Sequence, residues 1–133
     1  MAVYEKVLQK QPENWVAAND LAFLLSEYGS KPGDLDRALA LARKAYGRNA
    51  ENPAVLDTLG WIYYKKGDYR QAEALIVKAI NKAPESVMLN YHLGMIQLKT
   101  GQAEQGKQRL NFAVRSGDGF AGRPDALKAL GMQ

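Results

Sequence analysis

Histidine is the side chain best suited to proton transfer near neutral pH and to binding transition metals, and this chain has a single one, His92. It has no cysteine, so thiolate nucleophiles, disulfides and thiolate metal sites are excluded. A metal ion or a catalytic base needs further partners, and neither a second histidine nor a cysteine is available to His92. We therefore expect His92 to lie on a helix surface or between helices, and we predict no metal site and no catalytic residue.

The glycine-rich segment 117–122 is the other candidate for chemistry, because spaced glycines can let a backbone wrap around a phosphate. A dinucleotide-binding loop follows a strand and opens a helix, whereas this segment follows a helical pattern with no strand before it. We expect Gly117-Asp118-Gly119 to be a turn. Since no nucleotide motif is present, we predict no cofactor, no small-molecule substrate and no enzymatic activity.

The composition indicates a folded domain with a mixed-charge surface. Its 133 residues, 47% of them hydrophobic, suffice for one domain or for a piece of a longer repeat array. The net charge is +4, and the signs alternate along the chain, as at Lys66, Asp68 and Arg70, which is typical of a solvated surface. Nucleic-acid binding is therefore not expected, and salt-dependent RNA binding would be needed to support it. Apolar runs such as 21–25 are far shorter than the roughly 20 residues that span a bilayer.

Positions 34 residues apart carry the same residue types, which indicates an internal repeat. The identical pairs are Leu59 and Leu93, Gly60 and Gly94, Ile62 and Ile96, Lys65 and Lys99, Gly67 and Gly101, Gln71 and Gln105, and Ala79 and Ala113. Upstream, Leu21-Ala22 matches Leu59-Gly60 with four extra residues, 30–33, between them. These fall in a turn, where an insertion leaves the packing intact.

Each repeat has the pattern of two amphipathic helices. The first helix carries apolar residues at the spacing i, i+3, i+4, i+7, and the second carries a five-position apolar stripe that only Arg109 interrupts. Small residues recur at equivalent positions of both helices, where they let the two helices approach closely: Ala22, Gly60 and Gly94 in the first, and Ala38, Ala72 and Gly106 in the second. We expect helical hairpins at about 15–48, 53–84 and 87–116, and no β-sheet.

The segment from Leu59 to Tyr69, followed by Ala72, Ala79 and Pro84, resembles the tetratricopeptide-repeat consensus at nearly every signature position. The resemblance covers residues 15 to about 116, with departures at Ala50, Gln97 and Arg109. It implies an all-α, right-handed superhelical solenoid. It also implies that the first helices line a concave groove that binds peptides, and hence a protein-interaction scaffold.

The register of the repeats divides the chain into five parts. These are the second helix of a truncated preceding repeat at 1–12, unit 1 at 15–52, unit 2 at 53–86, unit 3 at 87–117, and a loop with a short capping helix at 118–133, which begins near Pro124. Met1 would then open the chain halfway through a repeat. The stripe formed by Tyr4, Val7 and Leu8 would normally be covered, so we expect residues 1–12 to fray or to dock against another copy, giving a homodimer.

Three segments are similar to the C-terminal ends of large bacterial repeat proteins of exopolysaccharide or PEP-CTERM protein-sorting systems. They are 57–61 (Asp-Thr-Leu-Gly-Trp), 91–94 (Tyr-His-Leu-Gly) and 120–123 (Phe-Ala-Gly-Arg). This resemblance implies a periplasmic or envelope-associated parent protein. Without it, a cytoplasmic location is equally compatible with the sequence.

The family's helix register assigns ten residues to the peptide-binding groove: Asn19, Phe23, Asp57, Trp61, Tyr64, Lys65, Met88, Tyr91, Met95 and Lys99. Relatives that bind acidic chaperone tails use a clamp of Lys, Arg and Asn. The matching positions here hold Asn19, Phe23, Thr58, Met88 and His92, so that clamp is absent. We predict a protein or peptide partner with an apolar or aromatic anchor.

Trp61 is expected on the concave surface rather than between helices, so its truncation should cost less than the ~3–5 kcal/mol typical of a buried tryptophan. Two alternatives remain open. The groove side chains could pack on neighbouring helices, or the segment could be a structural spacer or self-assembly unit of a longer solenoid.

Overall fold

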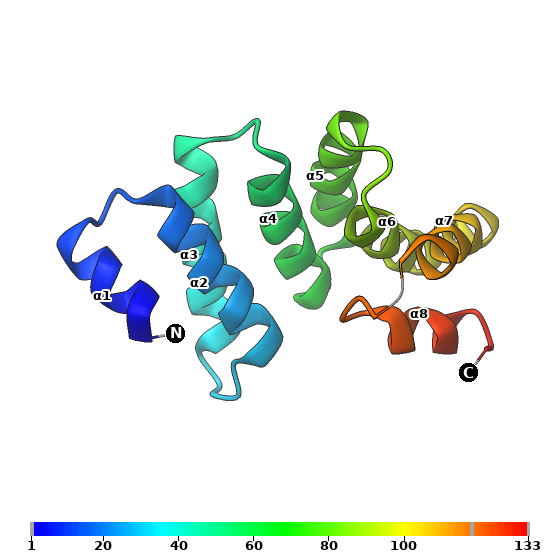
Figure 1. Cartoon of the computed structure of the whole chain (residues 1–133), viewed down its shortest axis with the longest axis horizontal. Helices are drawn as coiled ribbons and strands as arrows, with labels where there is room; N and C mark the ends of the chain where they lie inside the picture. Colours follow the sequence, from blue (N-terminus) through cyan, green and yellow to red (C-terminus); the bar gives the residue numbers. More distant parts are fainter. Residues whose placement is uncertain (1, 118, 133) are drawn as a thin grey trace.

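The structure, a computed structural model, describes residues 2–117 and 119–132; Met1, and Asp118 of the expected turn, lie outside these ranges. Within them the chain forms helices joined by short connections, with no strand (Figure 1). The helices are α1 (Ala2–Lys10), α2 (Trp15–Tyr28), α3 (Asp34–Arg48), α4 (Pro53–Lys65), α5 (Tyr69–Lys82), α6 (Val87–Lys99), α7 (Ala103–Ser116) and α8 (Arg123–Ala129).

The helices pack as three hairpins, α2 with α3, α4 with α5 and α6 with α7, and successive hairpins stack through α3 on α4 and α5 on α6. Helices α2, α4 and α6 also contact one another in order. The result is a curved array (Figure 1). The predicted all-α superhelical solenoid is therefore confirmed. In the part of the chain that the structure describes, no helix is long and apolar enough to cross a membrane.

Polar caps and glycines set where the helices begin and end. The Asn52 side chain accepts hydrogen bonds from the backbone N–H groups that follow Pro53, which occupies the first turn of α4. Asp68 accepts from the backbone N–H of Gln71, whose side-chain amide donates back to Asp68 at 2.7 Å. Between α4 and α5, Gly67 has a φ of +86°, a left-handed conformation that glycine adopts without strain.

The expected close approach of the hairpin helices is confirmed most clearly between α6 and α7. A Cβ added to Gly94 would lie 2.9 Å from the backbone oxygen of Gly106 and 2.8 Å from Cγ of Leu110. A Cβ on Gly60 would lie 2.8 Å from both Cδ1 and Cγ1 of Ile76, which are side-chain rather than backbone atoms. Glycine at 94 is thus required by backbone contact, because the opposing carbonyl cannot rotate away.

Arg109, the residue that interrupts the last apolar stripe, forms a polar link between α7 and the start of α6. Its Nη1 donates to the side-chain oxygen of Asn90 at 3.0 Å, and the Asn90 amide in turn donates to the backbone oxygens of Pro84 and Ser86. Burial lowers the pKa of the Arg109 guanidinium. The departure from the apolar pattern is therefore accommodated by hydrogen bonds.

The two ends of the solenoid differ. Helix α1 packs on α2, with Tyr4 and Leu8 against the core and Val3 70% exposed. Helix α8 folds back beneath α7 and α6 instead of continuing the array outward (Figure 1). The division into units 15–52, 53–86 and 87–117, the truncated repeat at 1–12 and its docking on another copy stay predictions.

Candidate peptide-binding groove

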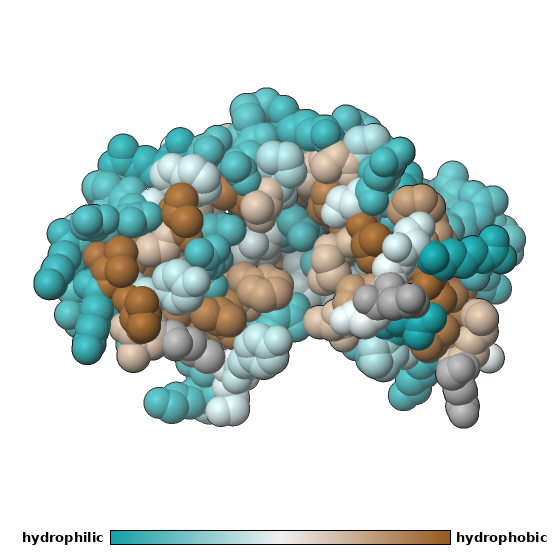
Figure 2. Space-filling view, in the orientation of Figure 1, coloured by the Kyte–Doolittle hydropathy of each residue, from teal (hydrophilic) through white to brown (hydrophobic). Residues whose placement is uncertain are grey.

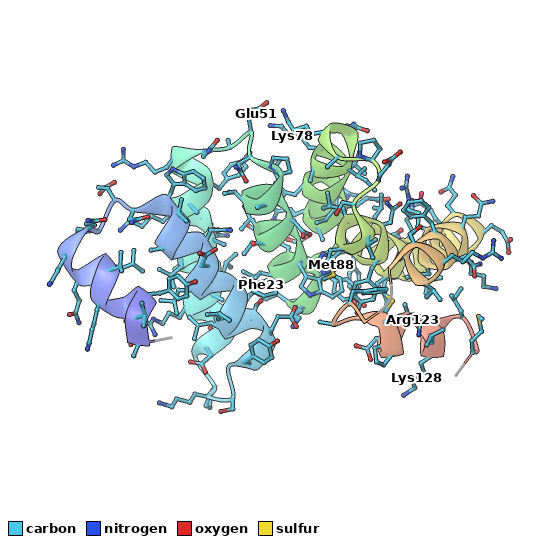
Figure 3. All side chains as sticks on the ribbon, viewed as in Figure 1. Phe23, Glu51, Lys78, Met88, Arg123 and Lys128 are labelled. Atoms are coloured by element: carbon cyan, nitrogen blue, oxygen red, sulfur yellow. The ribbon has the colours of Figure 1, made fainter. Side chains whose placement is uncertain are left out.

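The predicted groove residues come from α2, α4 and α6, which lie next to one another along the hollowed side of the molecule (Figure 2). Phe23 on α2 and Met88 on α6 both lie on that side (Figure 3). Two cavities there are lined by seven of the ten predicted residues: Asn19, Phe23, Asp57, Trp61, Lys65, Met88 and Tyr91.

The other three predicted residues line neither cavity. Tyr64 lies beside them and supports them by stacking on Trp61. Met95 packs against the same aromatic cluster. Lys99, at the end of α6, is not brought to the cavities. Most of the groove residues predicted from the repeat register therefore lie at or beside the two cavities. Lys99, at the C-terminal end of α6, does not.

Trp61 forms the centre of an aromatic stack. Its ring lies 4.4 Å from that of Tyr64 on one side, with 9° between their planes, and 3.9 Å from that of His92 on the other. The indole N–H donates to Glu27 at 3.0 Å, and Lys65 contacts the other oxygen of this carboxylate at 3.3 Å. The Trp61 ring is thus fixed by stacking on two faces and by one hydrogen bond.

The C-terminal segment 119–132 covers this stack. Phe120 packs on the Tyr91 ring with 5.6 Å between centroids, and the Gly122 backbone lies so close that a Cβ there would come within 2.1 Å of Tyr91 Cε2. Trp61 and Tyr91 are only 6% and 5% exposed. The expectation that Trp61 is exposed on the concave surface is therefore wrong. The stacked rings and segment 119–132 exclude water from the Trp61 ring.

Burial also changes the acidity of the stacked phenols. Desolvation raises the pKa of the Tyr91 hydroxyl well above its ordinary value, and the nearby carboxylate of Asp125 adds to the shift. The pKa of Tyr64 is raised by desolvation first and by Tyr69 and Asp125 next. Asp125, on α8, also lines one of the two cavities, and the helix register did not assign it to the groove.

His92 lies between helices, as expected, and is 2% exposed. Its Nδ1 is 2.6 Å from Oδ1 of Asp57 on α4. A carboxylate can only accept, so Nδ1 carries the proton of this hydrogen bond. Nε2 is buried and has no hydrogen-bond partner within 2–117 and 119–132. No group of three metal-ligating side chains gathers anywhere in the described residues.

The two cavities differ in access. The smaller, about 110 Å³, lies among Phe23, Trp61, Tyr91 and His92 and is also lined by residues of segment 119–132. The other, about 360 Å³, is formed by residues of α2 and α4 together with Tyr4 of α1, and no residue of segment 119–132 lines it. We call it the α2–α4 subsite; it is lined by Tyr4, Asn19, Asp20, Phe23, Leu24, Ala54, Asp57 and Thr58. A larger depression of about 780 Å³ is lined by 119–132 alone and contains none of the predicted groove residues.

Comparison with known proteins supports the repeat assignment. Residues 30–86 match the tetratricopeptide-repeat family model. A TPR repeat-containing protein of Pseudomonas aeruginosa is 36% identical over 61 residues, which is 46% of this chain and 10% of that protein. This chain therefore corresponds to a small part of that relative's length.

Two solved structures have closely similar folds. YrrB, described as a TPR protein with an unusual peptide-binding site, superposes with a TM-score of 0.73 at 25% identity, over 96% of this chain and 62% of YrrB. A thermophilic TPR protein of Thermus thermophilus gives 0.73 at 17% identity, over 97% of this chain and 70% of that one. The helical hairpins and these matches show that the chain has the solenoid fold of tetratricopeptide-repeat proteins, and its residues 30–86 match the model of that family.

Proposed function

We propose that this chain holds an extended segment of a partner protein along α2, α4 and α6. The α2–α4 subsite carries the proposal, because it brings Asn19 and Phe23 of α2 together with Asp57 of α4 in a cavity of about 360 Å³. Helical repeat arrays generally present such concave surfaces to other proteins. Tetratricopeptide proteins are in general scaffolds for protein interaction rather than enzymes.

Phe23 is the best anchor for such a partner. Its side chain is 36% exposed and lines both cavities, so a partner's apolar side chain could bury it. Aromatic residues in partly formed pockets often dominate interface energies. Trp61 and Tyr91, the anchors expected from the sequence, would be reached only if segment 119–132 moved aside, which makes the α2–α4 subsite the first point of contact.

The similarity to YrrB supports the same proposal. That protein is described as having a peptide-binding site, and the match to it extends over nearly all of this chain. An identity of 25% does not transfer individual contacts, so this chain's own side chains determine which partner segment fits.

The test compares two phenylalanine truncations. Phe112 on α7 is exposed to a similar degree, 39%, but lines neither groove cavity. In co-purification of partners with the tagged chain, Phe23→Ala should lower recovery of a specific partner about fivefold or more, whereas Phe112→Ala should not. Equal effects of the two variants would place the contact outside the groove and overturn the proposal.

A second candidate function is a spacer or self-assembly segment of a longer, envelope-associated solenoid, as expected for a parent of the exopolysaccharide or PEP-CTERM type. The observation that favours it is the exposed side of α1, where Val3 and Val7 border a shallow depression. Docking of this side on another copy would give a homodimer that shares Val7 with the stripe expected from the sequence, whose Tyr4 and Leu8 pack against the core. Sedimentation of the chain and of Val3→Glu is the test, because a dimer formed through α1 should dissociate in the variant.

A further inference from the structure

Two carboxylates, those of Asp20 and Asp57, are among the residues that line the α2–α4 subsite. Asn19 is more than nine-tenths buried, and its Oδ1 has no hydrogen-bond partner within the described ranges. Asp20 contributes a half-exposed carboxylate. Asp57 uses Oδ1 for His92, which leaves its second oxygen able to accept another bond.

The charge of the subsite is opposite to that of the whole chain. Two carboxylates line it, and no lysine or arginine is among its lining residues as far as the structure describes the chain. Lys65, which lines the smaller cavity, donates to the backbone oxygen of Ser26 at 2.7 Å and lies 3.3 Å from Glu27. A chain with a net charge of +4 thus presents a locally acidic surface where its concave side is open.

We propose that the α2–α4 subsite receives a cationic side chain, arginine or lysine, from the partner segment. This inference rests on the proposed function and specifies the partner's chemistry. An arginine provides up to five N–H donors, enough to pair with both carboxylates at once. Phe23, on the rim, packs against the stem of that side chain or against its apolar neighbour in the partner.

Neither an acidic nor a purely apolar partner side chain fits this surface. An acidic side chain would meet Asp20 and Asp57 with like charge and would find no cation to pair with among the described lining residues. A purely apolar side chain would bury the two carboxylates without replacing their water. The subsite therefore selects a partner in which a basic residue stands next to an apolar one.

The test uses three capped hexapeptides, acetyl-(Arg-Leu)₃-amide, acetyl-(Gln-Leu)₃-amide and acetyl-(Glu-Leu)₃-amide, followed by two-dimensional NMR of the isotopically labelled chain. The arginine peptide should shift the amide signals of Asn19, Asp20, Asp57 and Thr58 at lower concentration than the other two. Its affinity should fall several-fold when ionic strength rises from about 50 mM to about 300 mM, because screening weakens exposed charge pairs.

Asp20→Asn should weaken binding of the arginine peptide about fivefold, with little change in the spectrum elsewhere. Glu104→Gln on α7 removes the same charge outside the groove and is the matched control. If the glutamate or glutamine peptide shifts the same signals equally well, or if the control weakens binding as much as Asp20→Asn, the cationic preference is wrong while groove binding stands. If none of the three peptides shifts signals of α2, α4 or α6, both the inference and the proposed function fail.

Discussion

Gly122 offers a direct way to separate segment 119–132 from the aromatic stack. Its φ of −87° and ψ of 2° are accessible to any residue, so an alanine there meets no backbone penalty. The obstacle is the Tyr91 ring, whose Cε2, Cζ and Cδ2 atoms would lie 2.1, 2.3 and 2.7 Å from the added Cβ. Because that ring is itself packed against Trp61 and Phe120, it cannot move aside without disturbing them.

The cost of Gly122→Ala follows from two opposing effects. Overpacking a buried contact typically costs ~1–3 kcal/mol. Alanine also restricts the unfolded chain more than glycine does, which stabilises the folded state by about 0.4–1 kcal/mol. We expect a net cost of about 1–2 kcal/mol. Since the segment lies at one end of the fold, this should appear as local release of α8 rather than as unfolding of the hairpins.

Hydrogen exchange measures this release directly. The amides of Ala126 and Leu130 donate to the backbone oxygens of Gly122 and Ala126, so they exchange when α8 detaches. In Gly122→Ala their exchange should be roughly 5- to 30-fold faster, the equivalent of about 1–2 kcal/mol, with the α4 and α6 amides unchanged.

Two comparisons show whether the Tyr91 ring is the cause. Ala121→Ser adds one atom at the neighbouring exposed position and should leave exchange unaltered. In a Tyr91→Leu background the additional effect of Gly122→Ala should largely disappear, because the ring is gone. Unchanged exchange in Gly122→Ala, or an equal effect in the Tyr91→Leu background, would refute the close contact between the segment and the stack.

Three further outcomes are expected. Gly94→Ala should cost ~1–3 kcal/mol in denaturant unfolding because its Cβ meets the Gly106 carbonyl, whereas Gly47→Ala, with open space around it, should gain ~0.5–1 kcal/mol; equal effects would contradict the packing argument. Burial raises the pKa of Tyr91, so stability should be intact below pH ~10 and decline as pH rises through the unfolded-state pKa. In Tyr91→Phe the free energy of unfolding should decline less steeply between about pH 9 and 11. An identical dependence of stability on pH in the two proteins would exclude Tyr91 as the cause of the decline. Trp61→Ala should cost ~3–5 kcal/mol, since the ring is 6% exposed; a cost below ~1 kcal/mol would restore the surface placement inferred from the repeat register.

The fold could be predicted because its signals are local and repeated. Gly67 recurs as Gly101 and Gly60 as Gly94, and both positions have a geometric reason in the structure. The family's register likewise brought Asn19, Phe23 and Asp57 to one cavity, because equivalent positions of successive first helices face the same side. Periodicity thus carries information about every element that repeats.

The cover over the groove could not be predicted in the same way. Segment 119–132 does not repeat, so no period relates Phe120 or Gly122 to Tyr91, and a short helix after a proline was expected only to cap the array. The proximity of Asp57 and His92 could have been predicted in part from the repeat. Tyr91 is the repeat equivalent of Asp57, one period later, and His92 is the next residue, so neighbouring helices bring them together. The sequence repeat does not show the direction of these two side chains, so it could not predict their hydrogen bond.

The structure also constrains how a partner could use Asp57. If a cationic side chain drew Asp57 away from His92, the buried Nδ1–H would lose the acceptor it has in the described chain, and burying an unpaired donor costs about 1–3 kcal/mol. A partner that instead binds the second carboxylate oxygen keeps this bond and the stacking of His92 on Trp61. The favourable pose therefore approaches Asp57 from the α2 side, where Asn19 and Asp20 lie, and leaves the covered stack in place.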